Sequence, residues 1–436
     1  MEETVDDAER FSEERSGTVF LSSPLPGVVS ESTEDEGGDD ERGVAVSRPF
    51  LNRDAVNCAK GLCTLGVLTI HSNGLRNTYF YNFVVNRSVR VFMFLFGVTS
   101  ETWWERSSPR DGGIGGVETW YAYYQYRFRR LLPKWWCALM LWEFSGCAKR
   151  TIDLFVLANR SMQRINWPLA LMGFNPHWGT SWFVSEIIVL TALFPMMRQA
   201  SLKAWYNFSS NAVVALVGTS FNALVRKIKS PGAGVFSNRG STGALEALFH
   251  STDMLHGIEV MEPFQYAGSV SFGMWYARHG GTVSEAWMSF TASLIYAASV
   301  LSYALCAQNV SGLILGVLQN SIDVSLSFIV MLVSNRLARV RNDRENVGTT
   351  GTTAPGLWAL SRVARGLEAL GKGSWGFYLG HIVFYECMFY KHPKFLSRMY
   401  SSAPAGIRVA LLLAFGKFFD DGANGVIRLL SPADRT

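Results

Sequence analysis

The sequence predicts an all-α fold, a polytopic membrane helix bundle of about ten transmembrane helices. Hydrophobic residues make up 48% of the 436-residue chain and charged residues only 17%, an apolar excess over an average soluble protein. Apolar windows long enough to cross a bilayer recur along the chain, and Lys and Arg gather in separate stretches between them. These features favour an integral, multi-pass membrane protein.

Residues 1–50 differ from the rest of the chain. They hold 14 Asp or Glu against 4 Arg, and they lack the apolar content that would offset the entropy cost of ordering. We expect a disordered, acidic, cytosolic tail; the alternative is a tail that binds a protein partner. Acid stands where a signal peptide would have its basic n-region, and no apolar h-region follows, so a signal peptide is not expected. Residues 51–436 form the expected membrane domain.

Windows of about 17–25 apolar residues, enough to cross about 30 Å of hydrocarbon, mark the expected spans. They lie near 57–75, 84–104, 131–147, 181–199, 207–225, 257–278, 284–306, 310–334, 374–391 and 404–430. Residues 151–173 are too polar in their middle for a span, and we expect an outer or re-entrant loop there.

Basic residues set the expected orientation, because cytosolic loops are enriched in Lys and Arg. The loop 105–130 ends in YRFRR, and the loop 335–372 contains NRLARVRNDR and SRVARG. Ten spans with both termini in the cytosol place both loops on the cytosolic side. The RKIK stretch at 226–229 then falls outside and counts against this scheme. Which membrane holds the protein does not follow from the sequence.

Two other classes of function are not indicated. The WYAYYQYRFRRLLPKWW stretch at 120–136 interleaves rings and cations, a mixture that settles at lipid headgroups and, beside ten spans, does not predict nucleic-acid binding. The six cysteines show no C-x-x-C spacing, so neither a metal site nor a disulfide framework is expected.

Lys60 and His71 stand eleven residues apart in the first expected span. That spacing is three helical turns plus about 20°, with about 16 Å of rise, so the two side chains share a face. Both are costly in lipid and should point into the bundle, where they could line a path across much of the bilayer. The alternatives are a Lys60 that reaches inner-leaflet phosphates and a His71 that makes a structural polar contact.

Further motifs follow in a fixed order. They are KGLCTLGVLTIH at 60–71, VRVFMFLFGVTS at 89–100, YRFRRLLPKWW at 126–136, HWGTSWFVSEIIVLTALFP at 177–195, EPFQYAGSVSFGMWYAR at 262–278 and GKGSWGFYLGH at 371–381. Together they resemble the acyltransferase-3 family, many-spanning membrane enzymes that move acyl groups, commonly acetyl, onto sugar hydroxyls. A looser likeness is to the ten-span eukaryotic sialic-acid and polysaccharide O-acetyltransferases. The chain departs from the family pattern at Lys60, where Arg is usual, and at Thr99 and Ser100 in the second span.

The resemblance implies a membrane O-acyltransferase with acetyl-CoA or another acyl-CoA as co-substrate, no tightly bound cofactor, and a carbohydrate or glycolipid acceptor. His71 would be the general base, since imidazole suits neutral pH. Glu186 would orient that ring; an equal alternative is a structural ion pair. Lys60, Arg127 and Arg130 would hold the donor phosphates, although positive-inside anchoring explains the two arginines equally well.

The remaining candidates are acceptor contacts. Arg87 and Arg90 precede the second span on its outer side and would contact the acceptor or lipid headgroups. Trp178 would stack on a sugar or anchor the interface, and His381 and Tyr378, which share a helix face, would contact substrate or form a packed pair. Asp323 is a second membrane carboxylate without a motif.

Two other readings stay open. One is a transporter or channel that uses the intramembrane His, Lys and Glu for permeation, although no self-similarity between the halves of the chain supports it. The other is an inactive scaffold that kept the fold.

Overall fold

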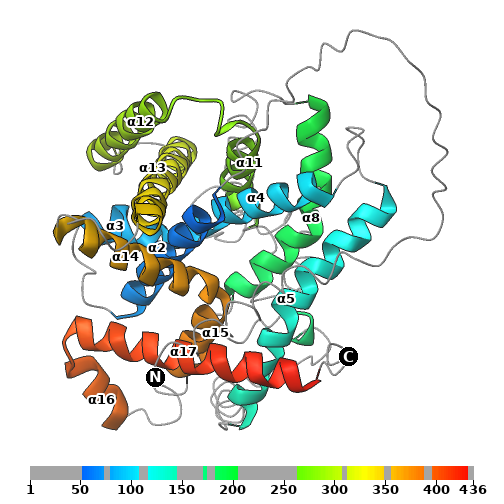
Figure 1. Ribbon diagram of the computed structural model, residues 1–436, viewed down its shortest axis with the longest axis vertical. Helices are drawn as coiled ribbons and strands as arrows, with labels where there is room; N and C mark the ends of the chain where they lie inside the picture. The colour runs from blue at the N-terminus through cyan, green and yellow to red at the C-terminus, as the bar shows by residue number, and fades with distance from the viewer. Residues whose placement is uncertain are drawn as a thin grey trace, which may run out of the picture. The chain divides into compact units, whose positions relative to one another are not determined.

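The computed structural model describes residues 52–72, 79–107, 116–144, 170–173, 182–204, 263–306, 312–347, 355–386 and 395–430. Within these ranges the chain is helical and contains no strand, which confirms the all-α fold class (Figure 1). The elements are α2 (Arg53–His71), α3 (Tyr79–Phe83), the 3₁₀ turn η2 (Val85–Arg87), α4 (Ser88–Ser107), α5 (Val117–Phe144), α8 (Trp182–Ala204), α11 (Pro263–His279), α12 (Glu285–Cys306), α13 (Gly312–Val347), α14 (Pro355–Lys372), α15 (Ser374–Glu386), α16 (Phe395–Ser402) and α17 (Ala405–Leu430).

Three of the described helical stretches are long and apolar enough to cross a membrane, judged by length and composition. They are Phe80–Ser107, Glu285–Leu305 and Gly316–Glu345, and they coincide with the second, seventh and eighth expected spans. Six other expected spans overlap α2, α5, α8, α11, α15 and α17. The span at 207–225 and the acidic tail 1–50 lie outside the described residues, so the count of ten spans and the orientation of the chain stay predictions.

Much of the two expected cytosolic loops is helical. Residues 117–130 form the first half of α5, and residues 335–372 contain the end of α13 and all of α14. The aromatic side chains of the first loop find partners on α4: Tyr123 is fully buried, with its ring centroid 5.4 Å from that of Trp103 and 5.5 Å from that of Trp104. Because these rings pack against another helix, the segment extends the expected third span as a helix.

Glycines let neighbouring helices touch backbone to backbone. A Cβ atom at Gly97 would lie 2.1 Å from the Val270 carbonyl oxygen, and one at Gly273 would lie 2.1 Å from the Phe94 carbonyl oxygen. Neither position tolerates a side chain at this distance, so α4 and α11 cross at these two glycines. Gly61 serves the same purpose between α2 and the backbone of α14.

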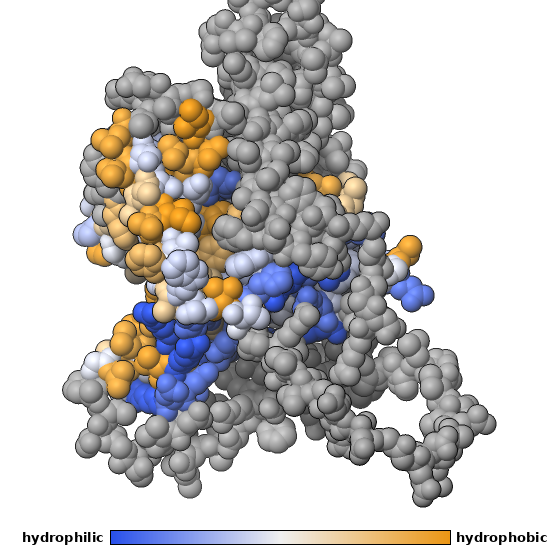
Figure 2. All heavy atoms as spheres, turned by 90° about the horizontal axis from the view of Figure 1, so that it is seen from above, coloured by the Kyte–Doolittle hydropathy of each residue, from blue (hydrophilic) through white to orange (hydrophobic). Residues whose placement is uncertain are grey.

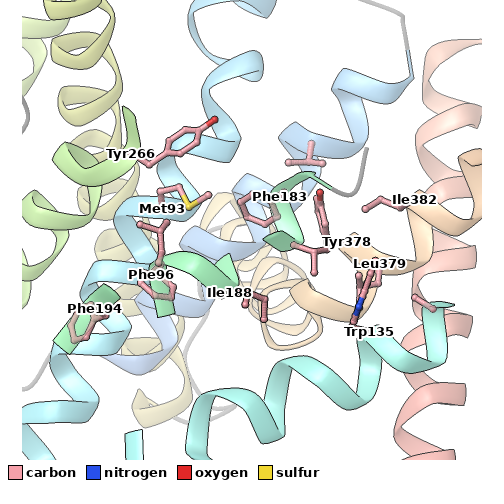
Figure 3. Packing of buried hydrophobic residues seen from close by; sticks show 14 of the residues in the cluster. Met93, Phe96, Trp135, Phe183, Ile188, Phe194, Tyr266, Tyr378, Leu379 and Ile382 are labelled. Carbon is pink, nitrogen blue, oxygen red and sulfur yellow. The ribbon is translucent and has the colours of Figure 1, made fainter. Parts of the chain in front are cut away.

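Large aromatic side chains fill the interior between α4, α5, α8, α11, α15 and α17. The bulkiest fully buried side chains include Trp104, Trp135, Trp142, Tyr123, Phe94 and Phe194. Figure 3 shows part of the cluster they belong to, with side chains from several helices pointing toward one another.

Helix α12 carries much of the exposed apolar surface. Trp287, Phe290, Leu301 and Leu305 each expose more than half of their surface. Figure 2 shows many apolar side chains (orange) at the upper left of the view, with paler ones among them, and many of the hydrophilic side chains (blue) below and toward the centre. Exposed apolar side chains on one helix are what a lipid-facing helix requires.

Candidate functional site

Two histidines from distant parts of the chain meet. His71 is the last residue of α2, and His381 lies in the middle of α15. Their ring centroids are 4.9 Å apart, with the ring planes tilted by 43°. His71 is half-buried and His381 is 1% exposed. The expected base and one of the expected substrate contacts therefore form a single histidine pair.

Two tyrosines of α15 flank the histidine pair. The ring centroid of Tyr385 lies 5.4 Å from that of His71, and the ring centroid of Tyr378 lies 5.1 Å from that of His381. The second distance confirms that Tyr378 and His381 share a helix face. Within the described residues no side chain is hydrogen-bonded to a ring nitrogen of His381; the backbone of Phe377 and Tyr378, one turn earlier in α15, acts on the ring. A buried imidazole keeps one donor and one acceptor nitrogen, and the side chains that the structure places beside this one are the rings of His71 and Tyr378.

Helix α8 begins beside the same rings. The Phe183 ring centroid is 4.7 Å from that of Tyr378, and Figure 3 shows the two side chains next to each other. Glu186 follows Phe183 by three residues, so it lies on the same side of α8, and it is buried. The expected orienting carboxylate thus lies one helical turn from a ring that packs beside the histidine pair.

An ion pair and a glycine hold α15 in place. Lys134 of α5 lies 2.6 Å from the carboxylate of Asp420 on α17. That carboxylate occupies the space a side chain at Gly376 would need, since a Cβ there would lie 1.9 Å from Asp420 Oδ1. The GKGSWG segment before His381 therefore has a structural role, because its glycine lets α15 pack tightly against α17.

The residues expected at the donor phosphates gather around Lys60, in the first half of α2. Lys60 is half-buried, and the charges of Arg130, Arg127 and Arg53 lie close enough to act on it. Within the described part of the chain, Lys60 forms no ion pair with an acidic side chain. A group of cations without a matching carboxylate is suited to an anionic ligand.

Arg127 is fixed by α4. It donates to the hydroxyl groups of Thr99, at 3.2 Å, and Ser100, and its guanidinium carbon lies 4.7 Å from the centre of the Phe96 ring. Thr99 and Ser100 are the two departures from the second-span family pattern, and both of their hydroxyls accept hydrogen bonds from this arginine. Arg130 is exposed and donates to the Tyr126 hydroxyl at 2.6 Å.

Arg87 and Arg90 converge on Asp323, a fully buried residue of α13. Arg87 Nη1 lies 3.2 Å from Asp323 Oδ1, and Arg90 Nη1 lies 2.5 Å from Asp323 Oδ2. We call these three residues the Asp323 cluster. In the structure the two arginines are therefore ion-pair partners of a buried carboxylate. Their expected contact with an acceptor or a lipid headgroup stays a prediction.

A second cluster of the same kind, the Glu101 cluster, lies farther along α4. Glu101 is fully buried, and Arg198 Nε donates to both of its carboxylate oxygens at 3.1 Å. Arg278 Nε donates to Glu101 Oε1 at 2.9 Å. The guanidinium of Arg198 also lies over the Trp104 ring, 5.3 Å from its centre. This cluster joins α4, α8 and α11.

Sequence reasoning missed the Glu101 cluster and gave Asp323 no partner. The signal was present, because a carboxylate inside an apolar span requires a cationic partner, and Arg198 and Arg278 stand near the ends of expected spans. Which cation pairs with which carboxylate depends on helix packing and could not be read from spacing. Trp178, the remaining expected site residue, lies outside the described residues.

Among the described residues no group of three or more His, Cys, Asp or Glu side chains could hold a metal ion. Comparison of the chain with protein-family models, with curated proteins and with solved structures gives no match.

Proposed function

We propose that the protein is a membrane O-acyltransferase that moves an acyl group, acetyl as the expected case, from cytosolic acyl-CoA to a hydroxyl group of a carbohydrate or lipid-linked acceptor. The observation that carries this proposal is the histidine pair, His71 and His381, with ring centroids 4.9 Å apart. An imidazole is the side chain best matched to general-base work at neutral pH.

In the proposed reaction His71 takes the proton of the acceptor hydroxyl while the oxygen attacks the carbonyl carbon of the thioester. A C–O ester bond forms and the C–S bond breaks. The proton then passes from the imidazolium to the CoA sulfur, so His71 returns to its neutral state and a free thiol leaves.

His381 would act on the base and not on the substrate. A neutral imidazole can accept a hydrogen bond from the second ring N–H of His71, which fixes the tautomer whose other nitrogen is free to take a proton. The burial of His381 and the 4.9 Å between the two ring centroids support this role. Glu186, one turn from Phe183, is the candidate for further orientation of the pair.

The cations around Lys60 support binding of the donor. Lys60, Arg127 and Arg130 would neutralise the phosphates of acyl-CoA beside the first half of α2, three helical turns from His71. Lys60 offers a point charge where Arg would offer a bidentate fork, so we expect it to contribute attraction more than fixed geometry. The eleven-residue separation, about 16 Å along a helix, leaves room for the extended pantetheine arm between phosphates and thioester.

Thiol release from acetyl-CoA by the purified protein, with and without a mixture of glycan acceptors, tests the proposal. His71→Gln should lower the rate by a factor of about 10² to 10⁴, the usual contribution of general-base catalysis. His279→Gln is the matched control, since His279 lies at the end of α11 and packs against Trp275; it should keep the wild-type rate.

The same preparation distinguishes the transporter alternative. The protein is reconstituted in vesicles and tested for both activities. If it releases no thiol with any acceptor, yet carries a proton or solute flux that His71→Gln abolishes, the transporter hypothesis would replace the acyltransferase hypothesis.

A further inference from the structure

The Asp323 cluster holds more positive charge than its carboxylate neutralises. Two guanidinium groups, those of Arg87 and Arg90, share the single carboxylate of Asp323. The side chains whose charges act on Arg90 besides Asp323 are the phenols of Tyr266 and Tyr303, and no second carboxylate is among them. The cluster therefore carries a net charge of about +1 in a setting where buried charges are normally paired.

Arg90 is the member of the cluster that can reach a ligand. Its side chain is 19% exposed, compared with 10% for Arg87 and 0% for Asp323. Nη1 donates to Asp323, and the structure gives Arg90 no other hydrogen bond within the described residues. A guanidinium has five N–H donors, so most of those on Arg90 remain for another acceptor. Asp323 fixes the orientation of the group.

A row of aromatic rings leads from Arg90 to the histidine pair. The guanidinium of Arg90 lies 5.7 Å from the centre of the Tyr266 ring. Tyr266, Phe183 and Tyr378 belong to one buried cluster, and Figure 3 shows Met93 and Phe183 in the region between the two tyrosines. Tyr378 in turn contacts His381. All three rings are buried, so they join the surroundings of Arg90 to the histidine pair through the packed interior.

We infer that Arg90 binds an oxyanion on the acceptor, either the carboxylate of an acidic sugar or a phosphate ester, and so holds the acceptor hydroxyl near the histidine pair. The inference rests on the proposed function and narrows its acceptor to an anionic class. Arginine suits this role because its planar fork matches carboxylate and phosphate oxygens.

Acceptor discrimination tests the inference. Purified protein is supplied with acetyl-CoA and with methyl β-glucuronide, glucose 6-phosphate or methyl β-glucoside, which carry a carboxylate, a phosphate or no charge. We expect kcat/KM for at least one anionic sugar to exceed that for the neutral sugar by about 10- to 100-fold, the range of a charge-assisted hydrogen bond. A preference for the glucuronide would identify the oxyanion as a carboxylate, and a preference for glucose 6-phosphate would identify it as a phosphate ester.

Arg90→Gln should reduce that ratio to within about threefold of one, and Arg90→Lys should keep part of it because the charge remains. Arg90→Gln leaves Asp323 paired with Arg87, so the fold should be retained. Arg278→Gln is the matched control: it removes one arginine from the Glu101 cluster and should leave the ratio unchanged. Equal use of charged and neutral sugars by the wild type, or full discrimination by Arg90→Gln, would overturn the inference.

A binding measurement separates this inference from the proposed function. Methyl β-glucuronide or glucose 6-phosphate should raise the melting temperature of the wild-type protein in detergent and should not raise that of Arg90→Gln. A shift in the wild type that is absent in Arg90→Gln, without any thiol release, would support the anion site and contradict the proposed acyltransferase activity. Thiol release without such a shift and without a preference for anionic sugars would support the acyltransferase activity and contradict the anion site.

Discussion

Helix α4 carries two clusters built from the same parts, one carboxylate and two arginines, and they differ in what they leave exposed. In the Glu101 cluster both arginines are almost completely buried, at 9% and 8% exposure, and Arg198 uses both carboxylate oxygens. In the Asp323 cluster the side chain of Arg90 is 19% exposed, and only its Nη1 donates to the carboxylate. The two clusters therefore share the same composition and differ in the exposure of their cations.

The Glu101 cluster is closed and holds three helices together. The Asp323 cluster is open and offers a hydrogen-bond donor, the guanidinium of Arg90. Glu101, Arg198 and Arg278 come from α4, α8 and α11, which the cluster joins at a point without solvent. Arg90 stands beside Tyr266 and the aromatic row that ends at the histidine pair. Each of the following changes should affect the two clusters differently.

The largest effect should follow Glu101→Gln. The substitution leaves two buried guanidinium groups without a carboxylate, and removal of one partner from a buried ion pair costs about 3–5 kcal/mol. Reversible unfolding in mixed micelles would measure the loss of unfolding free energy. A loss under about 1 kcal/mol would show that the Glu101 cluster is not what joins the three helices.

Gly273→Ala should come next, with a loss of about 1–3 kcal/mol from overpacking, because the added Cβ would meet the Phe94 carbonyl oxygen at 2.1 Å. The substitution should push α11 away from α4 and loosen Arg278 from Glu101, while the contact between α4 and α13 at Asp323 stays. Proteolysis or hydrogen exchange localised to α11 would verify this. Gly406→Ala is the control, since a Cβ at Gly406 meets nothing within 4 Å.

Asp323→Asn should cost less than Glu101→Gln, about 1–3 kcal/mol, because the exposed side of Arg90 can recover some hydration when its partner is lost. The same unfolding measurement compares the two variants directly. Equal losses would remove the distinction between a closed and an open cluster.

Arg90→Gln should have the smallest effect on stability, under about 1 kcal/mol, since a one-to-one pair between Arg87 and Asp323 remains. A loss as large as that of Glu101→Gln would mark Arg90 as a structural residue and would argue against its role in binding an anion.

The sequence predicted the helical fold class and the helix-local part of the site, for physical reasons that particular residues illustrate. The pairing of Tyr378 with His381 follows from a three-residue spacing on one helix. The contact between His71 and His381 joins residues 310 positions apart along the chain, and it depends on how α2 and α15 pack, which no local pattern records. The same is true of Asp323, whose partners lie on another helix.

The helical extension of α5 was missed for a related reason. The aromatic and cationic residues at 117–130 have the composition of a segment that lies at lipid headgroups. Their packing depends on Trp103 and Trp104 of α4, a helix that the local sequence does not reveal. Gly97 and Gly273 lie within two of the quoted motifs, at 89–100 and 262–278, and the structure shows that these two glycines form the crossing of α4 and α11.

A double-mutant cycle on the histidine pair tests the central claim most directly, with kcat/KM for acetyl transfer measured for the wild type, His71→Gln, His381→Gln and the double variant. If the two imidazoles work as one unit, the double variant should be no slower than His71→Gln alone, because effects within a catalytic unit are not additive. Losses that multiply would show two independent residues and would contradict the account.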